Sequence, residues 1–85
     1  METTINATQM KQGDVIRFYG AEFVIGEVYS RNVGTKDEVY WATGTTKTPS
    51  KAMLSVPSRY FPKNEAGEYT WGFQGNSFAH LTKVN

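Results

Sequence analysis

Apolar and polar residues alternate on both sides of a glycine in the first third of the chain. Residues 13–29 form one hairpin when a two-residue turn is placed at Gly20 and Ala21. Because successive side chains of a strand point to opposite faces, this register gathers four apolar side chains on one face. They are Ile16, Phe18, Phe23 and Ile25. Glycine at the first turn position favours a type II′ turn, so the pattern predicts an antiparallel hairpin with one apolar face.

The alternation of this hairpin breaks after Ile25. Strict alternation would turn Glu27 towards the apolar face and Val28 away from it. A β-bulge at Gly26 returns Val28 to the apolar face and bends the strand. The pattern therefore predicts a strand that curls its sheet.

A similar pattern occurs near the end of the sequence. A turn at Gly75 and Asn76 would pair residues 68–74 with residues 77–83. That register predicts an aromatic face formed by Trp71, Phe73, Phe78 and His80. Between the two hairpins, residues 38–44 alternate, with Trp41 on one face and Tyr40 on the other. We expect the aromatic faces of the two hairpins to meet around Trp41.

Shorter elements are expected in the remaining segments. Short strands are predicted over residues 2–6, 53–56 and 58–61, the last two on either side of Pro57. Helical turns are predicted over residues 7–12 and 49–53. Thr8 is the expected cap of the first turn, and Thr48 followed by Pro49 is the expected start of the second.

The composition fits one small β domain spanning residues 1–85. A chain of 85 residues buries only about 60–65% of its unfolded surface, so its core depends on large side chains. Aromatic residues make up 14% of the chain, and each buried ring removes about 150–250 Å² from water. We expect an all-β fold, either a small barrel or a strongly curled antiparallel sheet of about five to six strands, with one or two short helical turns.

Charge and cysteine content narrow the function classes. Nine Lys and Arg against eight Asp and Glu give a net charge of +1, without the marked basic excess typical of nucleic-acid binders. The absence of cysteine excludes disulfides and thiolate metal sites. No apolar run approaches the roughly 20 residues of a membrane span, and the opening residues lack the features of a signal peptide. We expect a cytoplasmic protein with no membrane partner.

Residue patterns for catalysis and metal binding are missing from the sequence. Nucleophilic catalysis needs a nucleophile, a base and an orienting group within hydrogen-bond reach. The sequence has one histidine, His80, serines without a nucleophile-elbow context, and scattered acidic residues without calcium-loop spacing. We therefore expect no enzymatic activity, no cofactor and no metal site.

Aromatic residues next to basic residues remain as candidates for function. Such pairs suit stacking on nucleobases, and they suit protein recognition equally, where Tyr, Trp and Arg are enriched anchors. Most rings are needed for the core, so the surplus rings expected at the surface are Tyr40 and Tyr60. The loop over residues 44–51 adds two lysines and no acid. The candidate binding residues are Tyr40, Lys47, Lys51, Arg59, Tyr60 and Lys63.

The run Met10 to Phe18, MKQGDVIRF, with Gly20 and Gly26 following, resembles the opening of SH3-like barrels of the KOW kind. In those barrels a Gly-Asp pair precedes a strand with alternate inward residues, so the resemblance implies an SH3-like barrel. The chain, including residues 71–76, is also similar to small phage-encoded barrel proteins of unassigned function. This similarity implies a location in the host cytoplasm and a role played by binding.

Three functions are compatible with these observations. The expected function is a non-enzymatic protein-binding module, which in a phage would be an inhibitor of a host enzyme or defence complex. The first alternative is a nucleic-acid-binding module of the SH3-like or KOW type, and the second is a small structural subunit of a phage particle. The expected partner is a host protein, with nucleic acid as the alternative, and no oligomeric state is inferred.

Overall fold

The computed structural model describes residues 2–85, which form one six-stranded antiparallel sheet in the order β1-β6-β2-β3-β4-β5. Its strands are β1 (Thr3–Asn6), β2 (Val15–Phe18), β3 (Ala21–Arg31), β4 (Val39–Thr46), β5 (Tyr69–Gly75) and β6 (His80–Lys83). Its helical elements are η1 (Ala7–Gln9), α1 (Lys51–Leu54) and η2 (Ser58–Tyr60). The expected all-β class with short helical turns is confirmed.

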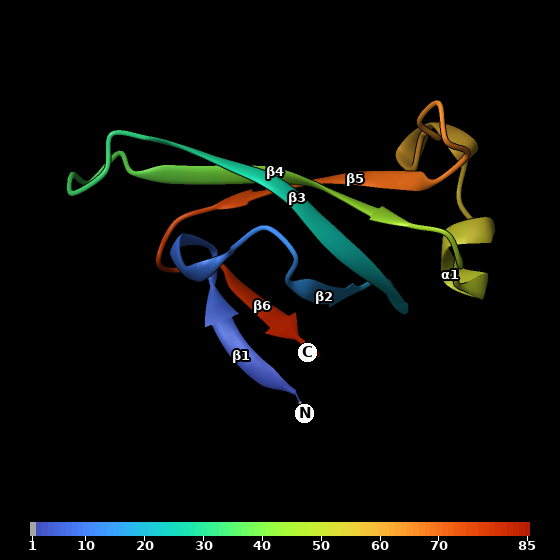
Figure 1. Ribbon diagram of the computed structural model, residues 1–85, viewed down its shortest axis with the longest axis horizontal. Coiled ribbons are helices and arrows are strands. Elements are labelled where there is room, and N and C mark those ends of the chain that lie inside the picture. Colours follow the sequence, from blue (N-terminus) through green and yellow to red (C-terminus); the bar gives the residue numbers. More distant parts are fainter. Residues whose placement is uncertain (1) are drawn as a thin grey trace.

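The longest strand, β3, is bent and joins two halves of the sheet (Figure 1). Its register with β4 shifts between Ile25 and Val28, which confirms the predicted bulge. Beyond the bulge Val28 packs against the core, while Glu27 is exposed. The early part of β3 pairs with β2, and β4 follows the strand past the bend. The bend lets both halves cover one core.

Inside this curl the core combines aliphatic and aromatic side chains. Its largest fully buried side chains are Phe23, Ile16 and Ile25. The Phe73 ring from β5 meets the Phe18 and Phe23 rings edge to face, with centroids 5.6 Å apart in both pairs. Phe61, from outside the sheet, adds a ring 5.2 Å from that of Trp71. Such pairs contribute about 0.5–1.5 kcal/mol each beyond the burial of their area.

The first hairpin confirms the predicted apolar face and corrects the predicted turn. Phe18 pairs with Ala21, so the turn residues are Tyr19 and Gly20, with φ angles of 56° and 80°. Positive φ at both central residues is the geometry of a type I′ turn, which matches the twist of the strands. The Ser50 hydroxyl donates a hydrogen bond of 2.6 Å to the Tyr19 carbonyl and so supports this uncommon conformation of a tyrosine.

The predicted C-terminal hairpin is wrong. β5 pairs with β4, and β6 pairs with β1 and β2. A turn at Asn76 separates β5 from β6. The Asn76 carbonyl accepts a hydrogen bond from Ala79 N–H at 3.1 Å, and its side chain accepts one from Phe78 N–H at 2.9 Å. This turn carries the chain across to the other half of the sheet. It leaves Phe78 85% exposed, not in the core as predicted.

Two aromatic assignments change with this pairing. Trp41 lies on the outer face of the sheet, opposite Tyr29 on β3, and so is not the meeting point of the aromatic faces. The faces meet around Trp71, whose ring stacks on that of Phe18 at 5.0 Å. The predicted pairing of His80 with Trp71 is also wrong, because β6 lies beside β1.

Residues 53–56 and 58–61, predicted as short strands, belong to α1, η2 and the turns after them. Each segment has one side chain buried in the core, Met53 in the first and Phe61 in the second, and Val56 packs against the core from its margin. A single buried side chain does not need an alternating strand. Pro57 between them has no N–H for a sheet ladder.

The caps of the helical turns differ from those predicted. Asn6 caps η1 in place of Thr8, with its side chain accepting the Thr8 N–H at 2.9 Å. Ser50 caps α1 in place of Thr48, accepting the Met53 N–H at 3.1 Å. The expected short strand and helical turn near the start of the chain are confirmed by β1 and η1.

The close approach of rings to Gly44 gives a test of the core. A Cβ at Gly44 would lie 2.5 Å from Cε2 of Phe73 and 3.0 Å from Cβ of Phe23. We expect Gly44→Ala to lower the free energy of unfolding by about 1–3 kcal/mol, as overpacking does. Urea unfolding would measure this loss.

Gly72 on the neighbouring strand is the matched control, because a Cβ there meets nothing within 4 Å. Gly72→Ala should leave the stability unchanged or raise it by up to about 1 kcal/mol. Equal losses in the two variants would contradict this packing.

Candidate functional site

An open groove of about 460 Å³ lies where β5 begins. Figure 1 shows α1 and the segment before β5 together at this end of the sheet. The lining residues are Met53, Leu54, Val56, Ser58, Arg59, Phe61, Pro62, Lys63 and Tyr69. The groove is therefore apolar, with two basic residues among those that line it.

Both basic residues are placed by aromatic rings. The Arg59 guanidinium carbon lies 5.3 Å from the centroid of the Tyr60 ring, and the Lys63 ammonium lies 4.9 Å from that of Tyr69. Both distances are within the range of cation–π attraction. Within residues 2–85 the ion pairs are those of Arg17 and Lys83, so neither groove cation has a carboxylate partner. The groove combines an apolar lining with uncompensated positive charge.

The groove adjoins a free edge of β5. The Thr70 N–H points away from β4, since it donates a hydrogen bond of 2.9 Å to the Pro62 carbonyl. Alternate residues of an antiparallel strand direct their N–H and C=O groups to the same side. The main-chain groups of Gly72 and Gln74 therefore also point away from β4, and both residues are exposed.

This edge lacks the usual protection of an edge strand. Lys63 makes a single bridge to Tyr69, and in the described part of the chain β5 has no strand neighbour other than β4. Natural edge strands are commonly blunted by charge, proline or bulges. β5, with the sequence YTWGFQG, carries no charge and no proline. Its exposed part can therefore accept another strand.

Two of the predicted binding residues line this groove, and a third lies next to one of them. Arg59 and Lys63 line it, and Tyr60, which is 48% exposed, lies next to Arg59. Lys51 begins α1, the helical turn that supplies two of the lining residues. Four of the six candidate binding residues therefore lie at this end of the molecule, namely Lys51, Arg59, Tyr60 and Lys63.

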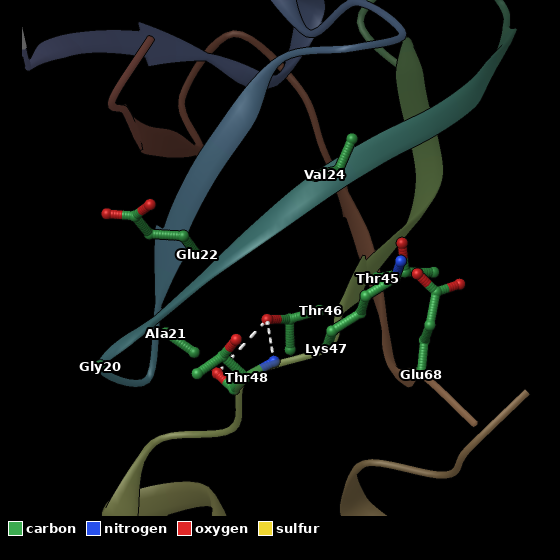
Figure 2. Close-up of a pocket in the computed structure, with 9 residues that line it drawn as sticks. All are labelled: Gly20, Ala21, Glu22, Val24, Thr45, Thr46, Lys47, Thr48 and Glu68. Atoms are coloured by element: carbon green, nitrogen blue, oxygen red, sulfur yellow. Dashed lines mark hydrogen bonds between the residues drawn. The ribbon is translucent and has the colours of Figure 1, made fainter. Parts of the chain in front are cut away.

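Lys47 belongs to a second groove of about 690 Å³, on the side of β3 and β4 near the first turn (Figure 2). Its lining residues are Gly20, Ala21, Glu22, Val24, Thr45, Thr46, Lys47, Thr48 and Glu68. The Thr46 hydroxyl accepts the Thr48 N–H at 3.3 Å and fixes the local loop. Two acidic residues here oppose the single lysine, so the charge of this groove is mixed.

Tyr40 does not join either groove. It is half-buried and packs against the core at the start of β4, so its expected surface position is wrong. The exposed rings of the described residues are those of Tyr19, Tyr29, Tyr60 and Phe78. Burial raises the pKa of Tyr40, and the Glu38 carboxylate adds to this effect.

An aromatic cluster on the outer face joins two segments that the sequence offers for stacking on nucleobases, Tyr29 to Arg31 and Tyr40 with Trp41, although Tyr29, Arg31 and Trp41 are not among the six candidate binding residues. The Tyr29 and Trp41 rings stack with centroids 5.9 Å apart, and the Arg31 guanidinium lies 5.9 Å from the Trp41 centroid. Tyr29 donates its hydroxyl hydrogen to the Glu27 carboxylate at 2.8 Å. Tyr29 on β3 pairs with Trp41 on β4. The sequence would have predicted this pair only if the register between these two strands had been known.

Neither metal ligands nor matches to known proteins assign a function. Within residues 2–85 no three His, Cys, Asp or Glu side chains group to hold a metal ion, and no helix has the length and apolar character of a membrane span. No protein-family model, curated protein or solved structure matches the chain. Function is therefore argued from the surface geometry.

Tyr29 provides a pH test of the outer-face cluster. The hydrogen bond to Glu27, and then the negative charge of that carboxylate, raise the pKa of Tyr29 above its ordinary value. This contribution to stability is present at neutral pH and is lost as the pH rises through the folded-state pKa of Tyr29. An NMR titration of the Tyr29 ring should show a lower pKa in Glu27→Gln.

Glu22→Gln is the control, since it removes an exposed carboxylate elsewhere on the same strand. It should leave the Tyr29 titration unchanged. A Tyr29 titration that is the same in wild type and Glu27→Gln would contradict the described hydrogen bond.

Proposed function

We propose that this protein is a non-enzymatic protein-binding module that takes an extended segment of its partner onto the free edge of β5. The observation that carries the proposal is the uncharged, exposed edge at Gly72 and Gln74 beside an apolar groove. In strand addition, main-chain hydrogen bonds supply affinity and side-chain pockets supply specificity. Pro62 and Lys63 already contact the start of β5 along this edge. The added segment would lie beside the same edge and pair with the following residues of β5.

The strength of such binding depends on the groove as well as the edge. The N–H and C=O groups of two residues allow four hydrogen bonds, each worth about 0.5–1.5 kcal/mol net. Their sum, about 2–6 kcal/mol, corresponds to a Kd between roughly 30 mM and 40 μM before the cost of ordering the segment. Burial of one large apolar side chain adds about 1.5–3 kcal/mol. A micromolar complex therefore needs both the edge and the groove.

The resemblances noted in the sequence suggest a more specific form of this proposal. The bent β3, shared by two halves of a small sheet, supports an SH3-like architecture. Similarity to small phage-encoded proteins suggests an inhibitor that occupies a surface of a host enzyme or defence complex in the cytoplasm. A structural subunit of a phage particle would use the same free edge to extend the sheet of a neighbour.

Nucleic-acid binding is a second candidate function, favoured by the stacked Tyr29 and Trp41 rings beside Arg31. Exposed rings next to an arginine suit stacking on unpaired bases. However, Glu27 lies in the same cluster, and a net charge of +1 gives little attraction for phosphates. Salt-dependent binding of a single-stranded oligonucleotide, lost in Trp41→Ala, would favour this function over protein binding.

The variant Gln74→Pro tests strand addition on β5. Proline removes the outward N–H of residue 74 and leaves the hydrogen bonds between β5 and β4 in place. We expect wild type to retain a stoichiometric protein partner from a nuclease-treated lysate of cells that express it. Gln74→Pro should weaken that complex at least about tenfold, which is 1.4 kcal/mol.

Gln74→Ala is the matched control, since it removes the side chain and keeps the N–H. It should bind as wild type does, and thermal unfolding should show that both variants are folded. Equal retention of the partner by Gln74→Pro and Gln74→Ala would count against the edge as the binding site.

A further inference from the structure

The groove beside β5 differs from the second groove in its charge. Its lining includes Arg59 and Lys63 and no acidic residue, whereas Glu22 and Glu68 line the second groove. Lys51 lies one helical turn before the lining residue Leu54, and residues three apart on a helix share a face. A third cation therefore stands near the rim of this groove.

In the described part of the chain none of these three cations forms an ion pair with a carboxylate. Of the two acids that follow Lys63 in the sequence, Glu65 makes no ion pair with a described residue, and Glu68 accepts a hydrogen bond from the Asn64 side chain at 3.1 Å. Within residues 2–85 no carboxylate lies within 4.0 Å of a cationic nitrogen of Arg59 or Lys63. The aromatic rings of Tyr60 and Tyr69 hold both cations beside the groove without removing their charge.

The apolar lining favours a large side chain of the partner. Leu54 is 62% exposed although it faces an apolar groove, so it has contact surface left for an added apolar group. Met53 at the base is buried against the core, and a flexible thioether adapts to differently shaped groups. The groove therefore offers an apolar seat with positive charge around it.

From these observations we propose that the groove selects a partner segment in which an aspartate or glutamate lies two positions from a large apolar residue. The inference rests on the proposed strand addition at β5, which would bring the segment to the groove in extended form. In an extended segment alternate side chains point the same way. The apolar residue would enter the groove, and a carboxylate two positions away, on the same side of the segment, would reach Arg59 or Lys63.

A random peptide library displayed for selection against the purified protein tests this proposal. Peptides retained by wild type should share a large apolar residue with Asp or Glu two positions away. Their affinity should fall at least tenfold in Arg59→Glu combined with Lys63→Glu. Their affinity for wild type should also weaken as the salt concentration rises, a measurement that needs no variant.

Lys11→Glu combined with Lys36→Glu is the charge-matched control, because both lysines are exposed and lie outside the groove lining. It should bind the selected peptides as wild type does. Peptides that lose binding in Gln74→Pro but carry no preference for acid would overturn the acidic selection and leave the proposed function standing. If no selected peptide is sensitive to Gln74→Pro, both proposals are overturned.

Discussion

The bend of β3 at Gly26 is the constraint on which the rest of the structure depends. One strand serves as the neighbour of β2 before the bulge and of β4 on both sides of it. Side chains from both halves therefore converge on a single core, where the rings of Phe18, Phe23 and Phe73 meet edge to face. A flat sheet with the same strands would expose one apolar face, and so small a chain has no second layer to cover it.

The route of the chain after β5 makes the candidate site. The turn at Asn76 sends β6 to β2 and β1, so β5 keeps one strand neighbour and one exposed edge. The segment between β4 and β5 folds into α1, η2 and a single bridge at Lys63, and it supplies most of the groove lining. The free edge and the cationic groove therefore lie side by side, because β5 forms the edge and the segment directly before β5 forms most of the groove.

The sequence predicted those features that depend on neighbouring residues along the chain. Alternation identified the buried face of the first hairpin and the bulge after Ile25, since both follow from side-chain direction within one strand. It did not predict the turn at Tyr19, because that conformation is supported by a hydrogen bond from Ser50. It also paired β5 with β6, because local alternation is equally compatible with either partner.

The candidate site was predictable in part for the same reason. Arg59 and Lys63 were identified because each lies next to or near a ring in the sequence, and the structure places both at one groove. The free edge of β5 could not be predicted, because it depends on which strands pair with β5. Alternation within one strand does not show its neighbours. Tyr40 was misplaced because its face depends on which side of β4 meets the core.

Amide hydrogen exchange of the free protein tests the central claim, that the edge of β5 is open, most directly. The N–H groups of Trp71 and Phe73 point towards β4, whereas those of Gly72 and Gln74 point to solvent. Residue-resolved NMR should therefore find slow exchange at the first pair and fast exchange at the second. Exchange at Gly72 and Gln74 as slow as at Trp71 and Phe73 would contradict an open edge.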